Sequence, residues 1–294
     1  MKKYSMLFIH FLSILLIACN GSGSKADAYG NFETDEITVS SETGGRIIWL
    51  AVEEGQIIDS GKFVGLIDTT QIALRRKQVE AQIVAASSRI PNITAQANVQ
   101  HEQIKVLNIE RNRLTKLLAD GAATQKQMDD VEGKIAIANK QIEAINSQRL
   151  SIVSEIEVLK TQLAQLIDQQ AKCKVINPIK GTVLSRFSNQ GEVVPMGKPI
   201  YKLANIDFLH LKVFVSGNQL HQFAIGDEVK VFIDGEDDNM IETTGIVSWV
   251  SSSAEFTPKI IQTREERVKM VYAVKIKVKN NGQLKIGMPG EVIF

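Results

Sequence analysis

The chain has 294 residues, 44% of them hydrophobic and 23% charged, so it can bury a core and is long enough for one to three domains. Its formal net charge of +1 gives no electrostatic case for nucleic-acid binding, and its composition is not that of a disordered protein. No Phe, Tyr or Trp lies between Gln71 and Lys172, which favours an elongated helical element over a globular core in that stretch.

The N-terminus has the features of a targeting segment. A basic start is followed by an apolar run over residues 6–17, which is too short to span a bilayer. The run ends in Leu16-Ile17-Ala18-Cys19, which resembles a bacterial lipobox. Residues 1–18 are therefore predicted to be a lipoprotein signal peptide, Cys19 the palmitate-bearing residue, and 19–36 a flexible tether. The alternative is an ordinary signal peptide with a chance cysteine. Residues 29–41 look extended and lead into the strand pattern that follows.

Segments 37–70 and 174–204 are two copies of one strand pattern. In each copy, short β-branched strands are separated by glycines, and the glycines of the two copies differ by a constant offset of 136 residues. The pattern resembles a half-motif of the biotinyl/lipoyl fold, so the two copies are predicted to form one lipoyl-like β domain. Glycine permits positive φ, and we expect structural turns at Gly45, Gly55, Gly61, Gly181, Gly191 and Gly197.

Residues 71–173 are predicted to form a coiled-coil helical hairpin inserted between these copies. Apolar residues recur at alternating spacings of three and four from Met128 to Cys173, interrupted only by Arg149 and Gln170. A weaker matching seam runs over residues 97–118. Two antiparallel arms of about 49 residues would each be roughly 73 Å long at 1.5 Å per residue.

The tip of the hairpin is predicted at residues 120–123, midway along the insert, where Gly121 can end a helix. Pro91 is expected to kink or break the first arm, because proline removes a backbone donor.

Residues 205–294 are predicted to form a β-barrel. Alternating strand patterns occur at 208–215, 227–233, 245–250 and 271–278, and residues 216–223 are expected to form a short helix capped by Ser216. The predicted fold class is therefore α+β, elongated and multi-domain, with a split lipoyl-like domain, an inserted helical hairpin and a C-terminal barrel.

No catalytic or metal-ligating pattern is evident. The four histidines share no ligand spacing, and Cys173 has no disulfide partner if Cys19 is lipidated. Gly55 to Lys62 ends in Gly-Lys but does not have the spacing of a phosphate loop. The chain is predicted not to be an enzyme and to need no cofactor.

The order of these elements resembles HlyD-type periplasmic adaptors, also called membrane fusion proteins, over essentially the whole mature chain. The hairpin tip sharpens the resemblance, since Arg113, Leu117 and Thr124 match the family's R-x3-L-x6-[ST] signature. Residues 254–267 and 284–289 resemble the family's barrel segment and closing strand. The chain ends soon after that strand, where many relatives continue, so a minimal membrane-proximal part is expected.

The resemblance implies a periplasmic adaptor, lipid-anchored at the inner membrane, that links an ABC, MFS or RND exporter to a TolC-like outer-membrane channel for export of small molecules or peptides. It implies a homo-oligomer, trimeric or hexameric. The near-neutral net charge predicts no nucleic-acid partner. The resemblance assigns channel contact to Arg113, Leu117 and Thr124.

Two other functions fit parts of the sequence. A biotinyl or lipoyl carrier holds its cofactor on a lysine between the two halves, but the long insert replaces that hairpin here and no Met-Lys-Met or Asp-Lys-Ala triplet occurs. A structural envelope lipoprotein, with the coiled coil as a spacer, explains the heptads but not the tip signature.

Overall fold

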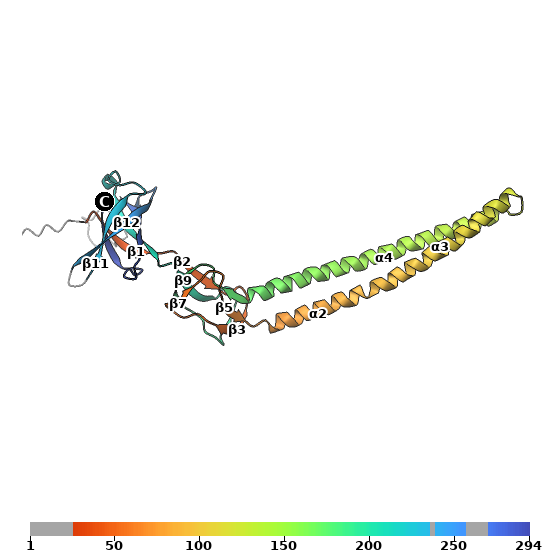
Figure 1. Ribbon diagram of the computed structural model, residues 1–294, viewed down its shortest axis with the longest axis horizontal. Helices are drawn as coiled ribbons and strands as arrows, with labels where there is room; N and C mark the ends of the chain where they lie inside the picture. The colour runs from red at the N-terminus through yellow and green to blue at the C-terminus, as the bar shows by residue number, and fades with distance from the viewer. Residues whose placement is uncertain (1–25, 236–238, 257–269) are drawn as a thin grey trace, which may run out of the picture. The chain divides into compact units, whose positions relative to one another are not determined.

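The computed structural model describes residues 26–235, 239–256 and 270–294. It divides into two compact units. One consists of Thr38–Ile179 and Val183–Lys202, and contains a β domain and a helical hairpin; the other holds the N-terminal residues up to Ile37, Lys180–Thr182 and Leu203–Phe294, and contains a barrel (Figure 1). The split lipoyl-like domain, the inserted hairpin and the barrel confirm the predicted fold class.

The lipoyl-like domain consists of two four-stranded sheets, and each sheet takes strands from both copies of the repeat. One sheet has the order β2 (Glu36–Ser40), β9 (Pro199–Ala204), β7 (Gly181–Arg186), β4 (Ile57–Ile58). The other has the equivalent order β6 (Lys174–Ile176), β5 (Phe63–Ile67), β3 (Gly45–Leu50), β8 (Val193–Val194). Neither copy therefore completes a sheet without the other.

Reciprocal backbone hydrogen bonds join the two copies. A turn glycine in each copy donates its N–H to a strand of the other copy, and that strand residue returns its own N–H to the residue after the glycine. The bonds are Gly55 to Val183 (2.8 Å), Val183 to Gln56 (2.9 Å), Gly191 to Ile47 (2.8 Å) and Ile47 to Glu192 (2.8 Å). The constant offset of the sequence repeat is thus a structural pseudo-symmetry.

The predicted turn glycines fall into two groups. Positive φ is found at Gly55, Gly61, Gly121, Gly191 and Gly197, as expected for turns. The prediction is wrong for Gly45 and Gly181, which begin strands β3 and β7 and have no positive φ. A Cβ at Gly45 would lie 2.7 Å from Ile67 Cγ2, and one at Gly181 would lie 2.7 Å from the Ala204 carbonyl oxygen. These two glycines permit close approach of strands.

The hairpin has a first arm of two helices, α2 (Thr70–Ser87) and α3 (Arg89–Ala119), and a second arm of one helix, α4 (Gln125–Lys172). The break at Ser88 follows from Pro91. Proline has no N–H to donate to residue 87, four positions earlier, and its ring clashes with that carbonyl. Pro91 therefore lies in the first turn of α3, where a missing donor costs nothing. The regular helix of the first arm is therefore interrupted at Ser88, although Ser88 keeps helical dihedrals and its N–H still donates to the Val84 carbonyl at 3.0 Å.

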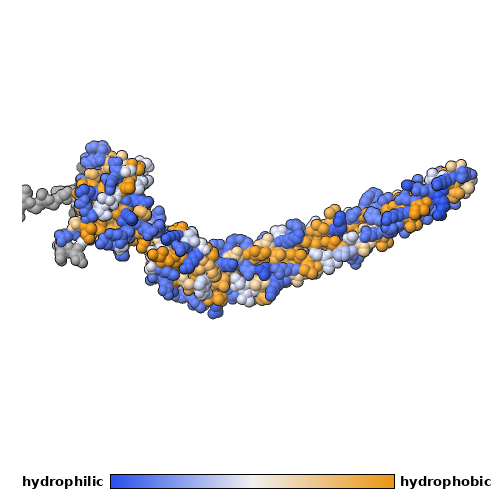
Figure 2. Space-filling model, viewed as in Figure 1, coloured by the Kyte–Doolittle hydropathy of each residue, from blue (hydrophilic) through white to orange (hydrophobic). Residues whose placement is uncertain are grey.

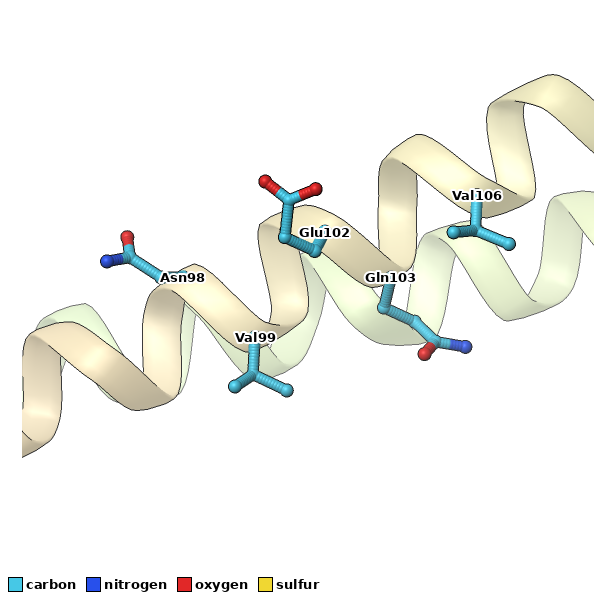
Figure 3. Close-up of a pocket in the computed structure, with 5 residues that line it drawn as sticks. All are labelled: Asn98, Val99, Glu102, Gln103 and Val106. Carbon is cyan, nitrogen blue, oxygen red and sulfur yellow. The ribbon is translucent and has the colours of Figure 1, made fainter.

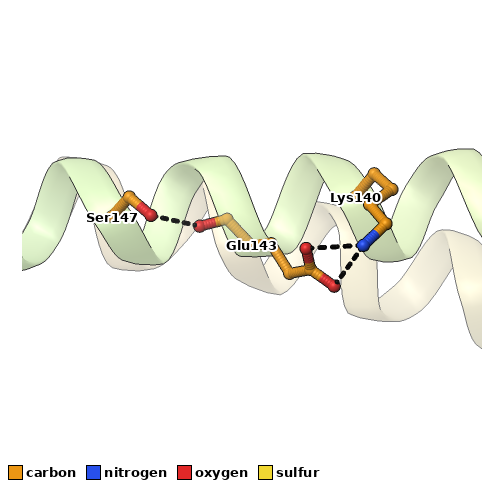
Figure 4. Close-up of polar contacts among 3 residues, drawn as sticks. All are labelled: Lys140, Glu143 and Ser147. Carbon is orange, nitrogen blue, oxygen red and sulfur yellow. Dashed lines mark hydrogen bonds and ion pairs between the residues drawn. The ribbon is translucent and has the colours of Figure 1, made fainter.

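The predicted seam of α4 faces the first arm. Its apolar members from Met128 to Leu166 are all buried or half-buried, whereas Arg149 is exposed. The other polar seam residue, Gln170, accepts a 2.9 Å hydrogen bond from Arg76 of α2. Away from the seam, charged side chains form surface ion pairs such as Lys140 with Glu143, at 2.9 Å (Figure 4). Some apolar residues also reach the hairpin surface, as the space-filling view shows (Figure 2).

The barrel is a closed ring of six antiparallel strands. Its order is β10 (Phe208–Ser216), β1 (Ala28–Glu33), β15 (Pro289–Ile293), β11 (Glu228–Asp234), β12 (Met240–Val250) and β14 (Met270–Lys279), and β14 pairs again with β10. The short β13 (Glu255–Phe256) pairs with the first two residues of β14, Met270 and Val271. The interior is apolar, with Phe32, Leu211, Val231, Ile276 and Val292 among the fully buried side chains.

Two expectations for this region need correction. The predicted tether over 19–36 is wrong for 28–33, because these residues form strand β1 between β10 and β15. Ala28 and Phe32 alternate into the core, a pattern too short to stand out in the sequence. The helix expected at 216–223 is a single 3-10 turn, η1 (Gly217–Gln219), where Gln219 Oε1 accepts hydrogen bonds from the Ser216 N–H and hydroxyl. The signal peptide and Cys19 lie outside the described residues.

Candidate functional site at the hairpin tip

The end of α3 is closed by a Schellman motif. Gly121 has φ +70°, its N–H donates to the Leu118 carbonyl at 3.1 Å, and the Ala122 N–H donates to the Leu117 carbonyl at 2.7 Å. These two bonds satisfy carbonyls that a helix end otherwise leaves free. The predicted tip at 120–123 is therefore a fixed turn.

The start of α4 is fixed by a capping box on Thr124. The Thr124 side chain accepts from the Gln127 N–H at 3.4 Å, and the Gln127 side-chain oxygen accepts from the Thr124 N–H at 2.8 Å. The Thr124 hydroxyl also donates to Gln127 Oε1 at 3.0 Å. Thr124 therefore has a structural role at this turn, whatever else it contacts.

A small apolar cluster packs the two arms together directly behind the turn. Leu114, Met128 and Val131 are buried at its centre, and Ala123 and Ile135 pack against them. Leu114 belongs to the predicted seam of the first arm, and the other two begin the seam of the second. The tip is therefore held by both local caps and interhelical packing.

The three residues of the tip signature are all exposed. Arg113 and Leu117 are four residues apart on α3, so they project from the same side of the helix. Leu117 is 38% exposed, although other apolar side chains of the hairpin, such as Val99 at 64%, are more exposed. The Arg113 guanidinium pairs with Glu110 at 2.8 Å, with 65% of the arginine side chain exposed. Such a surface pair contributes little stability and leaves the cation available to another molecule.

The sequence predictions did not include Gln127 or Glu110 among the residues that shape the tip. A signal for Gln127 was present, because Thr-x-x-Gln before an apolar run is the pattern of a capping box. The Glu110 pair follows from a spacing of three on one helix, which is common on exposed helices and carries little information by itself.

An open hollow lies farther along the hairpin, and all five residues that line it come from α3, namely Asn98, Val99, Glu102, Gln103 and Val106 (Figure 3). Within residues 26–235, 239–256 and 270–294, no three His, Cys, Asp or Glu side chains are grouped so that they could hold a metal ion. In the same residues, no helix is both long and apolar enough to cross a membrane.

Comparison with known proteins gives sequence relatives and solved structures that span most of the chain. No protein-family model matches. A UPF0194 membrane protein of Yersinia enterocolitica is 25% identical, over 90% of this chain and 88% of its own length. Among solved structures, MacA from Actinobacillus actinomycetemcomitans superposes with a TM-score of 0.52 and 20% identity, covering 90% of this chain and 76% of MacA.

The membrane fusion protein Spr0693 of Streptococcus pneumoniae R6 is also similar, with a TM-score of 0.50 and 18% identity over 90% of this chain and 96% of Spr0693. At these identities the likeness establishes architecture, and that architecture is the one the HlyD-type resemblance predicts. The chain therefore has the fold of the membrane fusion proteins.

Proposed function

We propose that this protein is a periplasmic adaptor that links an inner-membrane exporter to a TolC-like outer-membrane channel for the export of small molecules or peptides. The exporter would be of the ABC, MFS or RND type, and the adaptor would supply contact and alignment without chemistry of its own. The observation that carries the proposal is the hairpin tip, a turn fixed by two caps that displays Arg113 and Leu117 on one helix face.

The tip suits recognition of another helical protein. A preorganised turn loses little conformational entropy on binding, so its exposed side chains can contribute their full contact. Leu117 would pack in an apolar site, and Arg113 would exchange Glu110 for carboxylate or carbonyl acceptors on the channel. The Thr124 hydroxyl would keep accepting from the Gln127 N–H and would either accept one further bond or turn its single proton from Gln127 Oε1 to the channel.

The proposal includes a lipid anchor and assembly. Lipidation of Cys19 would hold the protein at the membrane, and we place that membrane as the inner one. One hairpin cannot enclose a conduit, so several copies, three or six, would have to form a ring.

Site-specific photo-crosslinking in cells tests the channel contact. A photoreactive residue replaces Leu117, and the captured partner is identified by mass spectrometry. The matched control replaces Val99, which is 64% exposed on the same helix but far from the tip. Capture of a TolC-like channel from position 117 and not from position 99 supports the adaptor function. Failure at 117 in a folded protein would contradict it and favour the spacer lipoprotein.

A further inference from the structure

The outer surface of the barrel is electrically polarised. In the closed ring, β10 lies opposite β11, three strands away in either direction. The charged residues of β10 and its neighbours β1 and β14 are four lysines and one acid, besides His210. Those of β11 and its neighbours β12 and β15 are four acids and one lysine. The first set is Lys212, Lys275, Lys277, Lys279 and Glu33; the second is Glu228, Asp234, Glu242, Glu291 and Lys230.

We call the first surface the lysine face: the outward side of β1, β10 and β14, with the four lysines Lys212, Lys275, Lys277 and Lys279. Strand register sets the lysines side by side. Lys277 lies between His210 of β10 and Ile246 of β12, and Lys275 lies between Lys212 of β10 and Trp249 of β12. Burial and the charges of Lys275 and Lys277 lower the pKa of His210, against the opposing charges of Asp35 and Glu33.

Large apolar side chains border the lysines. Phe208 and Trp249 are each 42% exposed, and Ile246 is 52% exposed. The Lys277 ammonium lies 4.4 Å from the centre of the Phe208 ring. Among the lysines, only Lys275 has an acidic partner within the described residues, Glu33 at 2.7 Å. Lysines interleaved with exposed aromatic rings are typical of surfaces that lie at the boundary between anionic headgroups and acyl chains.

The start of the chain emerges between β10 of this face and β15 of the acidic surface, at the end of β10 away from Phe208, and the Asp27 N–H donates to the Val292 carbonyl of β15 at 2.9 Å. Strand β1 pairs directly with β10, and the Asp27 carbonyl accepts a 2.8 Å hydrogen bond from Gln219, just after the end of β10. Only eight residues separate Cys19 from Ala28, and fully extended they span at most roughly 30 Å. A lipid on Cys19 would therefore keep the barrel close to the bilayer.

We propose that the lysine face lies on the surface of the anchoring membrane and binds anionic phospholipid headgroups, with Trp249 and Phe208 at the level of the headgroups. For its orientation this inference rests on the lipid anchor of the proposed function. The acidic surface around β11 then points away from the membrane. Each lysine close to an anionic surface strengthens binding by roughly fivefold, and the gain is screened by salt.

Tryptophan quenching tests this directly. The chain has two tryptophans, so Trp49→Phe leaves Trp249 as the sole reporter; Trp249 lies on β12 at the edge of the lysine face, beside Lys275. The full lipidated chain is incorporated into vesicles of brominated phosphatidylcholine, with or without phosphatidylglycerol, because bromine quenches tryptophan only at close range. A matched variant carries Trp49→Phe, Trp249→Phe and Phe232→Trp, which places the reporter on β11.

Phosphatidylglycerol is expected to increase quenching of Trp249 about threefold or more, and to leave position 232 unquenched. High salt or Lys212→Ala with Lys277→Ala should remove most of the increase, while Lys230→Ala should not. Equal quenching at the two positions, or none at Trp249, overturns the proposal. Capture of a membrane protein by a photo-crosslinker at position 277, with Trp249 unquenched, would assign the face to a protein partner instead.

The mass of the N-terminal peptide is determined first, because it reports the lipid on Cys19 independently of quenching. An unmodified Cys19 would contradict the anchor in the proposed function. Binding through lysines does not require the anchor, so the same quenching comparison would still decide the lysine face.

Discussion

The lipoyl-like domain and the hairpin are stabilised in opposite ways. In the lipoyl-like domain, reciprocal hydrogen bonds join residues more than a hundred positions apart, such as Gly55 with Val183 and Gly191 with Ile47. At the hairpin tip, every bond that shapes the turn joins residues within five positions of each other. The first region folds only as a pair of copies, whereas the tip is encoded locally and supported by a seam.

This difference separates residues that hold the fold from residues free to serve function. A substitution in the interlocked strands disturbs both copies at once, because each sheet contains strands of both. An exposed side chain at the tip, such as Leu117, can change without loss of a buried contact. Substitutions in the two regions should therefore give different kinds of defect, and the following predictions are ordered from the largest effect to the smallest.

The largest effect is expected on export, from the tip. Replacing Arg113 and Leu117 together by alanine should reduce export to background while the free energy of unfolding changes by less than about 0.5 kcal/mol, as is usual for surface sites. The measurement is cellular efflux or secretion with urea denaturation of the same variant. Matched controls are Lys140→Ala, from a similar exposed ion pair with Glu143, and Val106→Ala.

Those controls should export normally. If the double variant also exports normally, the tip does not contact a channel. If the double variant unfolds the hairpin, the tip is not an independent, locally encoded site.

The next effect is on stability, at the two glycines where strands approach closely. A Cβ at Gly181 would lie 2.7 Å from the Ala204 carbonyl oxygen. This is a backbone atom, which cannot move away by a change of side-chain rotamer. We expect Gly181→Ala to cost about 2–3 kcal/mol, as in other overpacked sites. Gly45→Ala, its repeat equivalent, should cost less, because the atom 2.7 Å away is a methyl of the Ile67 side chain.

Urea denaturation in a Trp249→Phe background checks this, because Trp49 in β3 then reports the lipoyl-like domain alone. An equal loss of stability at the two glycines would mean that the Ala204 backbone and the Ile67 side chain move equally easily to make room for a Cβ. That result would contradict the packing explanation.

The contrast between the regions also explains what the sequence could and could not reveal. The α4 seam was evident because its period repeats over many turns, and the break near Pro91 follows from the chemistry of one residue. The extended character of residues 29–41 was readable, but the strand at 28–33 could not be placed in the barrel because its partners, β10 and β15, lie far away in the chain. The roles of Gly45 and Gly181 could not be predicted from the sequence for the same reason. The close contact at each glycine depends on a residue of the opposing strand, Ile67 or Ala204.

At the tip, residue identities were readable from the signature, and the capping box was readable from Thr124 and Gln127. The lysine face was not readable, because its four lysines come from two strands separated by a long stretch of chain. Only the pairing of β10 with β14 brings them together.

A smaller effect is expected from a buried hydrogen bond inside the lipoyl-like domain. The Tyr201 hydroxyl donates to Asn177 Oδ1 at 2.9 Å, and burial raises the pKa of Tyr201 to about 12. The unfolded chain releases this proton near pH 10, so the stability it contributes is complete below pH 10 and is lost as the pH rises toward 12. Tyr201→Phe should cost about 1–2 kcal/mol at neutral pH, because it leaves Asn177 Oδ1 without its donor.

The urea midpoint followed by Trp49 between pH 8 and pH 11, a range that brackets the reference value of about 10, measures both effects. Relative to the wild type, the phenylalanine variant should show a shallower decline above that value. An identical decline in the two proteins would show that other groups control alkaline unfolding.

The smallest effect is expected at Thr124, and it decides between two roles for one side chain. Thr124→Ala removes the cap and should destabilise the start of α4 by about 1 kcal/mol or less, whereas Thr124→Asp restores a capping acceptor. Helicity near the tip can be followed by amide hydrogen exchange of residues 125–130.

If Thr124 acts only as a cap, the aspartate variant should keep both protection and export. If the hydroxyl also contacts the channel, the aspartate variant should keep protection and lose export, because a carboxylate in its place cannot donate a hydrogen bond and brings a charge into the contact. Unchanged protection in the alanine variant would mean that the capping box does not fix this turn, and the tip would then depend on the Leu114 cluster alone.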